Sequence, residues 1–362
     1  MATHEGPTEK PIPLDAGGTP TVSVIIAAYN AAVHVGGAIN ALLAQTVKNI
    51  EILVVDDCSK DSTSDIVSRL AESDPRIRLI RRDGNGGPGP ARNSGLDVAR
   101  GEWISVVDAD DGLDPRRLET MLALADRHGA DMLADNQWLV DGGSGANFDL
   151  MFPPSHLDQP KVVTAPDFVR NNRPSSVKRK YGLLKPLIRK DFLDRNGIRY
   201  RDAYLGEDFL FYLECLIRGA RFVLVPEAFY FYQLSRGTLS QTRSLIHADE
   251  FIRNCENLMG RADVQAIPGL VEALRDRSAE LRSDFVYLQF AQAIKRRHFA
   301  TLLKVVWKSP QLLPYVAGQG LRVGKLRLLQ GFRRPERGRP ATENGYLKSR
   351  SPNALDAGGA GK

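Results

Sequence analysis

The stretch VSVIIAAYNAAVHVGGAINALL, residues 22–43, joins a run of apolar residues to a helical pattern. Residues 22–28 are apolar almost without a break, which is typical of a strand buried on both faces. The segment that follows repeats apolar residues at helical spacing, namely Val35, Ile39, Leu42 and Leu43. We therefore expect one strand followed by one helix, with residues 29–30 at the turn between them.

The same pattern recurs further along the chain. Apolar runs at 50–55, 77–80 and 103–107 are each followed by helical spacing. Continuously apolar strands that alternate with helices indicate an α/β fold with a mostly parallel central sheet covered on both faces. We place helix starts at Asp61-Ser62 and at Asp114-Pro115, because Asp, Ser and Pro favour the first positions of helices. A helix over 207–219, a strand over 222–232 and two or three helices within 246–308 complete the expected elements.

The composition is that of an ordinary globular protein. The 362 residues are 43% apolar and 25% charged, which excludes a fibrous or wholly disordered chain. Three scattered cysteines are too few for a disulfide framework or a zinc site, which favours a reducing compartment. Residues 1–18 lack the apolar core of a signal peptide, and no run approaches the ~18 apolar residues of a membrane helix. We therefore expect a cytoplasmic protein.

The charge is unevenly distributed. The net charge is +6, yet residues 1–294 carry 34 basic and 40 acidic residues. Between Lys295 and Arg350 there are 14 basic residues and two acidic ones. Such a basic tail, which also carries Trp307 and Tyr315, suits an anionic membrane surface. A solvated face or a nucleic-acid contact would need the same charges, so charge alone leaves these alternatives open.

Acidic residues gather where the predicted strands end. Asp56 and Asp57 follow the second strand, and the sequence Asp-Ala-Asp-Asp at 108–111 follows the fourth. Ligands of such sheets lie beyond the carboxyl ends of the strands. Neighbouring carboxylates repel one another unless a cation lies between them, so the acids at 108–111 predict a site for Mg²⁺ or Mn²⁺ completed by substrate phosphates. Asp61 and Asp114 are instead expected to stabilise turns.

A glycine loop offers a competing interpretation. Gly84, Gly86 and Gly89 satisfy the G-x-G-x-x-G pattern of dinucleotide-binding proteins, and Asp108 lies at a suitable distance after them. The loop follows the third strand rather than the first, however, and two prolines interrupt it. An NAD-dependent oxidoreductase, or a nucleotide-binding protein without turnover, is therefore kept as an alternative.

Five segments together resemble the family 2 glycosyltransferases, which are inverting enzymes of the GT-A fold. The segments are VSVIIAAYN (22–30), EILVVDDCSKDST (51–63), GPARNSG (89–95), GEWISVVDADD (101–111) and GEDF (206–209). The resemblance covers residues 20–240 and implies a Rossmann-like nucleotide-diphospho-sugar transferase fold. It divides that domain into a nucleotide-sugar-binding half, 20–138, and an acceptor-binding half, 139–240. We expect a disordered segment at 1–19, a helical extension at 241–330 that associates with membranes, and a disordered basic tail at 331–362.

The resemblance also implies roles for individual residues. Asp208 would be the catalytic base, with Glu207 beside it, and Asp110 would be the direct metal ligand, with Asp108 as its companion in the motif. Arg236 would clamp the diphosphate, and Lys185 would lie near the acceptor, although a surface lysine is an equal alternative there. The residues implied to bind the nucleotide-sugar are Ala28, Tyr29, Asp56, Asp57, Arg92, Asn93, Asp108 and Ala109.

Within the family, the chain is most similar to bacterial exopolysaccharide glucosyltransferases of the succinoglycan type. This similarity rests on three segments, namely GPGPARN at 87–93, Ala134-Asp135-Asn136 after the next strand, and Leu-Lys-Pro at 184–186. The resemblance implies a UDP-sugar donor and an acceptor oligosaccharide on an undecaprenyl diphosphate carrier. It gives the basic tail a role at the inner face of the membrane, and no role with nucleic acid.

Overall fold

The computed structural model describes residues 18–141, 148–172, 180–203, 206–234 and 248–295, together with the single positions 307 and 318. Of the expected disordered segments, residues 1–17 of the first (1–19) and all of the second (331–362) lie outside these residues, and so does the expected clamp Arg236. The chain divides into one compact unit over 1–312 and a second over 313–362. All elements named below belong to the first unit.

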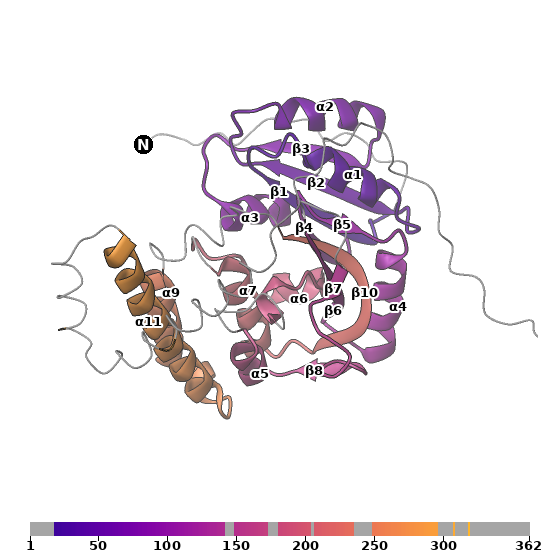
Figure 1. The fold of residues 1–362 in the computed structure, drawn as a ribbon. Helices are drawn as coiled ribbons and strands as arrows, with labels where there is room; N and C mark the ends of the chain where they lie inside the picture. The colour runs from indigo at the N-terminus through magenta and orange to yellow at the C-terminus, as the bar shows by residue number, and fades with distance from the viewer. Residues whose placement is uncertain are drawn as a thin grey trace, which may run out of the picture. The chain divides into compact units, whose positions relative to one another are not determined.

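Four parallel strands form the first half of the sheet (Figure 1). They are β1 (Val22–Ala28), β2 (Ile50–Asp56), β3 (Ile77–Arg81) and β4 (Trp103–Asp108), in the spatial order β3-β2-β1-β4. The four apolar runs predicted from the sequence are therefore confirmed as strands. Val24 and Ile26 of β1 pack into one buried cluster, whereas Ile25 between them packs into another. This alternation shows that the strand is buried on both faces, as its continuous apolar sequence requires.

The second half of the sheet mixes directions. Next to β4 lies the short antiparallel β9 (Leu187–Arg189), followed by β6 (Met132–Asp141) and β10 (Phe222–Leu234), which are parallel to each other. Three further short strands, β5 (Gly112–Leu113), β7 (Phe148–Leu150) and β8 (Lys161–Val163), pair antiparallel to these. Residues 134–136, expected after a strand, lie within β6 instead, because the apolar run before them continues as buried extended backbone.

Helices cover both faces of the sheet. The buried cluster on one face includes residues of α1 (Val35–Leu43), α2 (Thr63–Ser73) and α4 (Arg117–His128), and the cluster on the other face includes α3 (Pro88–Val98). Helix α3 begins inside the predicted glycine loop, because proline is tolerated in a first helical turn. Helix α4 begins two residues later than predicted. The carboxylate of Asp114 accepts from the N–H of Arg116 at 2.8 Å and so stabilises the turn before the helix.

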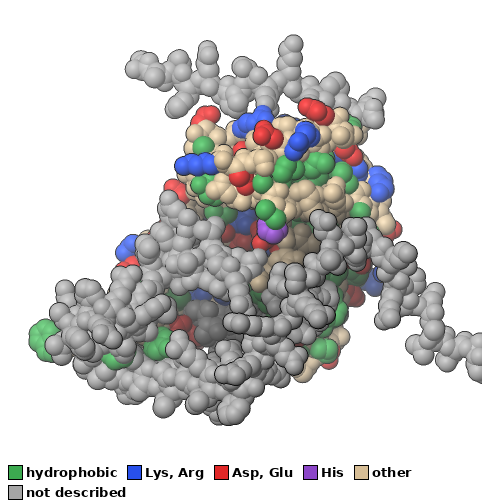
Figure 2. Space-filling model, turned by 45° about the horizontal axis from the view of Figure 1, so that its top comes forward, with side chains coloured by type: hydrophobic (Ala, Val, Ile, Leu, Met, Phe, Trp, Pro, Cys, Tyr) green, Lys and Arg blue, Asp and Glu red, His purple; other side chains and the backbone are tan. Residues whose placement is uncertain are grey.

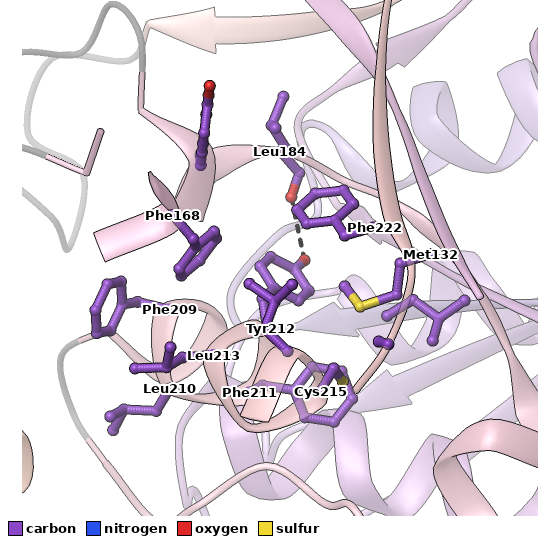
Figure 3. Packing of buried hydrophobic residues seen from close by; sticks show 14 of the residues in the cluster. Met132, Phe168, Leu184, Phe209, Leu210, Phe211, Tyr212, Leu213, Cys215 and Phe222 are labelled. Carbon is purple, nitrogen blue, oxygen red and sulfur yellow. Dashed lines mark hydrogen bonds between the residues drawn. The ribbon is translucent and has the colours of Figure 1, made fainter. Parts of the chain in front are cut away.

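Helix α7 (Glu207–Ile217) is buried on nearly all sides (Figure 3). Phe209 of α7 stacks on Phe168 of α5 (Ala165–Arg170) with ring centroids 5.3 Å apart. The hydroxyl of Tyr212 donates to the carbonyl of Leu184 at 3.1 Å, just after the 3-10 turn η1 (Tyr181–Leu183). These contacts fix the helix, and with it the two acidic residues of its first turn.

Three helices follow the sheet within the described residues: α9 (Ala248–Met259), α10 (Ala262–Gln265) and α11 (Leu270–Lys295). The two longer ones lie side by side, and α11 also packs against α5 (Figure 1). The predicted set of two or three helices is thus confirmed as far as residue 295. Another short helix, α6 (Lys190–Arg195), follows β9. Within the described ranges, no helix combines the length and apolar character that a membrane span requires.

Candidate functional site

The carboxyl ends of β1 and β2 are held together by their loops. The backbone carbonyl of Ala28 accepts from the N–H of Asp57 at 2.8 Å, and the Asn30 side chain accepts from the N–H of Lys60 at 2.8 Å. Asn30 has φ 50° and Cys58 φ 63°, so both turns use the left-handed conformation. Ala28 is buried, whereas the side chain of Tyr29 stays 46% exposed at the point where β1 ends. An aromatic ring is therefore open to a ligand beside the switch point between β1 and β4.

The glycine loop is bound to a carboxylate of the protein itself. Asp57 is buried, pairs with Arg82, and accepts from the N–H groups of Gly86 at 3.1 Å and Gly87 at 2.8 Å. In a dinucleotide fold such amides face the pyrophosphate, and the loop follows the first strand rather than an outer one such as β3. The pattern in this chain is therefore a structural turn, and the dinucleotide interpretation is wrong. Asp56, also buried, accepts from the N–H of Ser59 at 3.2 Å.

A cluster of two cations and three carboxylates lies beyond β4. Arg92 of α3, which is 4% exposed, donates from Nη1 to Glu207 and to Asp208, both at 2.9 Å. Its Nη2 donates to Oδ1 of Asp108 at 3.1 Å. Lys185 donates from Nζ to Oδ2 of Asp208 at 3.1 Å and lies 2.9 Å from Oδ2 of Asp108. Asp108 and Asp208 are therefore each bridged by both cations, and segments from four parts of the chain meet at one point.

Lys185 is an interior residue. It is 2% exposed, which excludes the surface lysine that the sequence left open. Burial alone would lower its pKa, but the carboxylates of Asp108 and Asp208 raise it above its usual range, so the ammonium stays charged. The neighbouring Leu184 accepts a hydrogen bond from Tyr212 of α7, and β9 begins two residues after Lys185. Residues 184–186 are therefore held between α7 and β9.

The acids of the motif at 108–111 have different surroundings. Burial would raise the pKa of Asp108, but Lys185 and Arg92 lower it to about 2. For Asp110, burial and the neighbouring charge of Asp108 raise the pKa. Asp111 is buried, accepts from the Tyr230 hydroxyl at 2.6 Å and from the N–H of Gln233 at 2.8 Å, and has a strongly raised pKa from burial and from Asp108. Asp111 thus ties the motif to β10, whereas Asp108 and the half-buried Asp110 remain at the site.

Two residues hold Arg92 in place. Asn93 forms a reciprocal pair with the backbone of Tyr200, accepting from its N–H and donating to its carbonyl, each at 2.8 Å. The Tyr200 ring lies 5.3 Å from the Arg92 guanidinium and stacks on Phe211 of α7 at 4.0 Å. Asn93, expected to border the donor, therefore contacts the backbone that positions Arg92. Glu207 and Asp208 lie in the first turn of α7, where the helix dipole favours negative charge.

Arg117 contacts the cluster through the backbone of Lys185, and no sequence motif pointed to it. It is fully buried, pairs with Asp135 at 2.9 Å, and donates to the backbone carbonyl of Lys185 at 2.5 Å. Its guanidinium also lies 5.0 Å from the ring of Tyr230, whose hydroxyl contacts the motif at 108–111. In the sequence nothing distinguishes it from Arg116 beside it, since only the packing of α4 on β6 buries one and exposes the other.

The acidic residues fit a metal ion that a substrate would complete. Within the described residues, no group of three or more His, Cys, Asp or Glu side chains is placed to hold a metal ion by itself. Mg²⁺ commonly uses one or two carboxylates plus substrate phosphates, and Asp108 and Asp110 supply that number. Burial, and after it the charge of Asp108, raises the pKa of Asp110, and a dication bound there would favour the ionised carboxylate. In Figure 2, acidic side chains are visible near the centre of the view, close to a histidine side chain.

Comparison with known proteins shows the family and the fold. The sequence model of Glycosyl transferase family 2 matches residues 23–178. The chain is 35% identical over 302 residues to the succinoglycan biosynthesis protein ExoO of Rhizobium meliloti (strain 1021), covering 82% of this chain and 84% of that protein. It is 28% identical over 310 residues to ExoU of the same strain, covering 82% and 86%.

Solved structures share the fold. A complex of S. aureus TarS 1-349 with UDP-GlcNAc superposes with a TM-score of 0.56 at 21% identity, over 81% of this chain and 82% of that one. The mannosyltransferase PcManGT from Pyrobaculum calidifontis, in complex with GDP-Man and Mn²⁺, gives 0.54 at 17% identity, over 88% and 84%. Both similarities concern the fold alone.

Proposed function

The chain belongs to the family 2 glycosyltransferases, and we propose that it transfers a hexose, glucose, from a UDP-sugar to a hydroxyl of a lipid-linked oligosaccharide. The reaction would serve bacterial exopolysaccharide biosynthesis, in keeping with the succinoglycan relatives. The acceptor would be carried on undecaprenyl diphosphate. The observation that carries the proposal is the junction of Asp108 and Asp208 through Arg92 and Lys185. It brings the end of β4, on the donor side, to the start of α7, on the acceptor side.

Asp208 is the proposed base of a single displacement. It accepts the proton of the acceptor hydroxyl while that oxygen forms its bond to the anomeric carbon. The bond from that carbon to the phosphate oxygen breaks, and UDP leaves with the electron pair. Attack from the face opposite the leaving group inverts the centre, so an α-linked donor gives a β-glycoside. Arg92 and Lys185 hold the Asp208 carboxylate by one oxygen each, which fixes its orientation for this transfer.

Asp110, with Asp108, would hold Mg²⁺ or Mn²⁺, which as a Lewis acid neutralises charge on the departing diphosphate. Tyr29 and Ala28 would lie against the nucleotide base, with Asp56 and Asp57 close to the base or ribose. Because the Asp57 carboxylate is already bonded to the glycine loop, its contribution would come through the shape of that loop. Ala109 would border the donor, and Asn93 would contribute there through the Tyr200 backbone that it holds. Arg236 would contact the diphosphate.

The basic tail would keep the enzyme at the inner face of the cytoplasmic membrane, where a lipid-linked acceptor lies. Between Lys295 and Arg350 the excess of positive charge is large enough to attract anionic lipids, and the attraction would weaken with salt. The protein would thus be peripheral rather than embedded.

Transfer with the purified protein tests the proposal. A panel of UDP-sugars is supplied with a prenyl-diphosphate-linked glycan acceptor and Mn²⁺, and the product is examined by mass spectrometry and NMR. Incorporation of one hexose with a β-configured anomeric proton is the expected result. UDP-sugar binding without any transfer or hydrolysis would instead indicate a nucleotide-binding protein without turnover.

A further inference from the structure

Among the described residues, one buried arginine outside the proposed catalytic cluster has no carboxylate partner. Arg277 of α11 is 7% exposed, and its Nε and Nη1 have no hydrogen-bond partner in the part of the chain that the structure describes. The guanidinium lies 5.4 Å from the ring of Phe209 and 5.5 Å from that of Phe251. Aromatic faces stabilise a cation in part, but they do not accept the hydrogen bonds that the N–H groups of a guanidinium direct within its own plane. A buried guanidinium in this state is prepared to bind an anion.

Groups that lie near Arg277 carry charges of both signs. Lys180, just before η1, is close enough that burial and the charge of Arg277 lower its pKa to about 8. Glu280 and Asp284, further along α11, act on Arg277 electrostatically, yet no ion pair with it is found among the described residues.

The position of Arg277 connects it to the proposed acceptor side. Phe209 directly follows Asp208 in α7, and Phe251 of α9 packs on the start of the same helix. A Cβ at Gly206 would come within 2.2 Å of the Phe251 ring, so the contact between α9 and the start of α7 is close. An anion bound by Arg277 would thus lie behind the two rings that support the first turn of α7.

We propose that Arg277, together with Lys180, binds a phosphate group of the acceptor. An arginine fork matches phosphate oxygens in a bidentate manner, and an ammonium adds a point charge beside it. The inference rests on the proposed function in one respect, because a lipid-linked acceptor carries its sugar on a diphosphate. The site would hold that diphosphate while the sugar hydroxyl reaches Asp208.

The test compares Arg277→Met and Arg277→Lys with the matched control Arg275→Met, which removes an exposed arginine from the same helix. Two acceptors with the same sugar are used, one linked to a short prenyl diphosphate and one to a neutral alkyl chain. Arg277→Met should raise the KM for the diphosphate acceptor by about 10- to 100-fold, as expected for lost charge-assisted hydrogen bonds. Its KM for the alkyl acceptor and for the UDP-sugar should match the control, and Arg277→Lys should lie in between.

Stability separates a binding role from a structural one. Removing an unpaired buried charge should leave the Tm of Arg277→Met unchanged or higher than that of the wild type. A lower Tm with equal losses on both acceptors would overturn the proposal, as would equal KM values in Arg277→Met and the control.

Calorimetric titration of the diphosphate acceptor into the full chain, with UDP present at saturation, is independent of turnover. Binding that Arg277→Met weakens, without any transfer by the wild type, would support the anion site and count against the proposed function. Transfer by the wild type, with binding that Arg277→Met does not weaken, would support the proposed function and count against the anion site.

Discussion

The Nζ atom of Lys185 lies 3.1 Å from Oδ2 of Asp208, in a place where both side chains are shielded from solvent. Arg92 contacts the other oxygen of the same carboxylate. A carboxylate held by two buried cations cannot rotate freely, so the orientation of the proposed base is determined before any acceptor binds. Through this carboxylate, the segment at 184–186 and helix α3 are both tied to the start of α7.

Replacing Asp208 by Asn should leave UDP-sugar binding unchanged and slow turnover at least ~10²-fold, because the amide cannot accept the hydroxyl proton. The control is Asp202→Asn, an exposed aspartate six residues earlier, which should keep full activity. Calorimetry gives the donor affinity, and single-turnover kinetics give the rate. A normal rate in Asp208→Asn would place the base elsewhere.

Asp110→Ala should abolish both the metal-dependent part of UDP binding and turnover, since one of two proposed ligands is lost. Titration of UDP with and without Mn²⁺ measures the difference. Asp83→Ala, which removes an exposed carboxylate after β3, is the matched control and should retain the metal effect. Metal-dependent binding that survives in Asp110→Ala would contradict the assignment.

Arg117→Met should destabilise the protein by about 3–5 kcal/mol, because it leaves the fully buried carboxylate of Asp135 without its partner. Arg116→Met next to it removes a mostly exposed side chain and should change stability by no more than about 0.5 kcal/mol. Urea unfolding compares the two variants. Equal stabilities would show that the buried pair contributes nothing to the fold.

The stability of the protein should depend on pH through Lys180. Burial and the charge of Arg277 lower the pKa of Lys180 to about 8. Between pH 8 and the ordinary lysine pKa, Lys180 is therefore deprotonated in the folded protein but protonated in the unfolded chain. Stability from this group therefore rises between pH 8 and about 10.5. In Arg277→Met the rise should be smaller, which thermal unfolding at several pH values can measure. Parallel curves for both proteins would refute the coupling.

The basic tail predicts salt-sensitive membrane binding. Arg333→Gln combined with Arg334→Gln, in the full chain, should weaken binding to phosphatidylglycerol vesicles by about 30-fold at low salt, given about 1 kcal/mol for each basic residue near the surface. The control pair, Arg116→Gln with Arg275→Gln, changes the same charge in the first unit. Sedimentation with vesicles measures both. If the two double variants bind alike, the tail has no special role.

The parallel half of the sheet and the position of its acidic ends could be predicted from local sequence patterns. Unbroken apolar runs such as 22–28 and 103–107 report burial on both faces, and this property belongs to the segment itself. The polar residues that follow β1, β2 and β4 must then meet at one edge, because parallel strands share their direction. The family resemblance rested on the same segments, and similarity to relatives over 82% of the chain confirms it.

Which charged side chains meet could not be predicted in this way, because it depends on how distant segments pack. Arg92 and Glu207 are 115 residues apart, and no local pattern pairs them. From the sequence, Lys185 could equally have been a surface lysine, and Arg117 could not be distinguished from Arg116. The packing of α4, β6 and α7 buries Lys185 and Arg117 and leaves Arg116 exposed. Hydrophobic periodicity reveals whether a segment is buried. The partner of a buried charge depends on segments distant in the chain, so it appears only when they pack together.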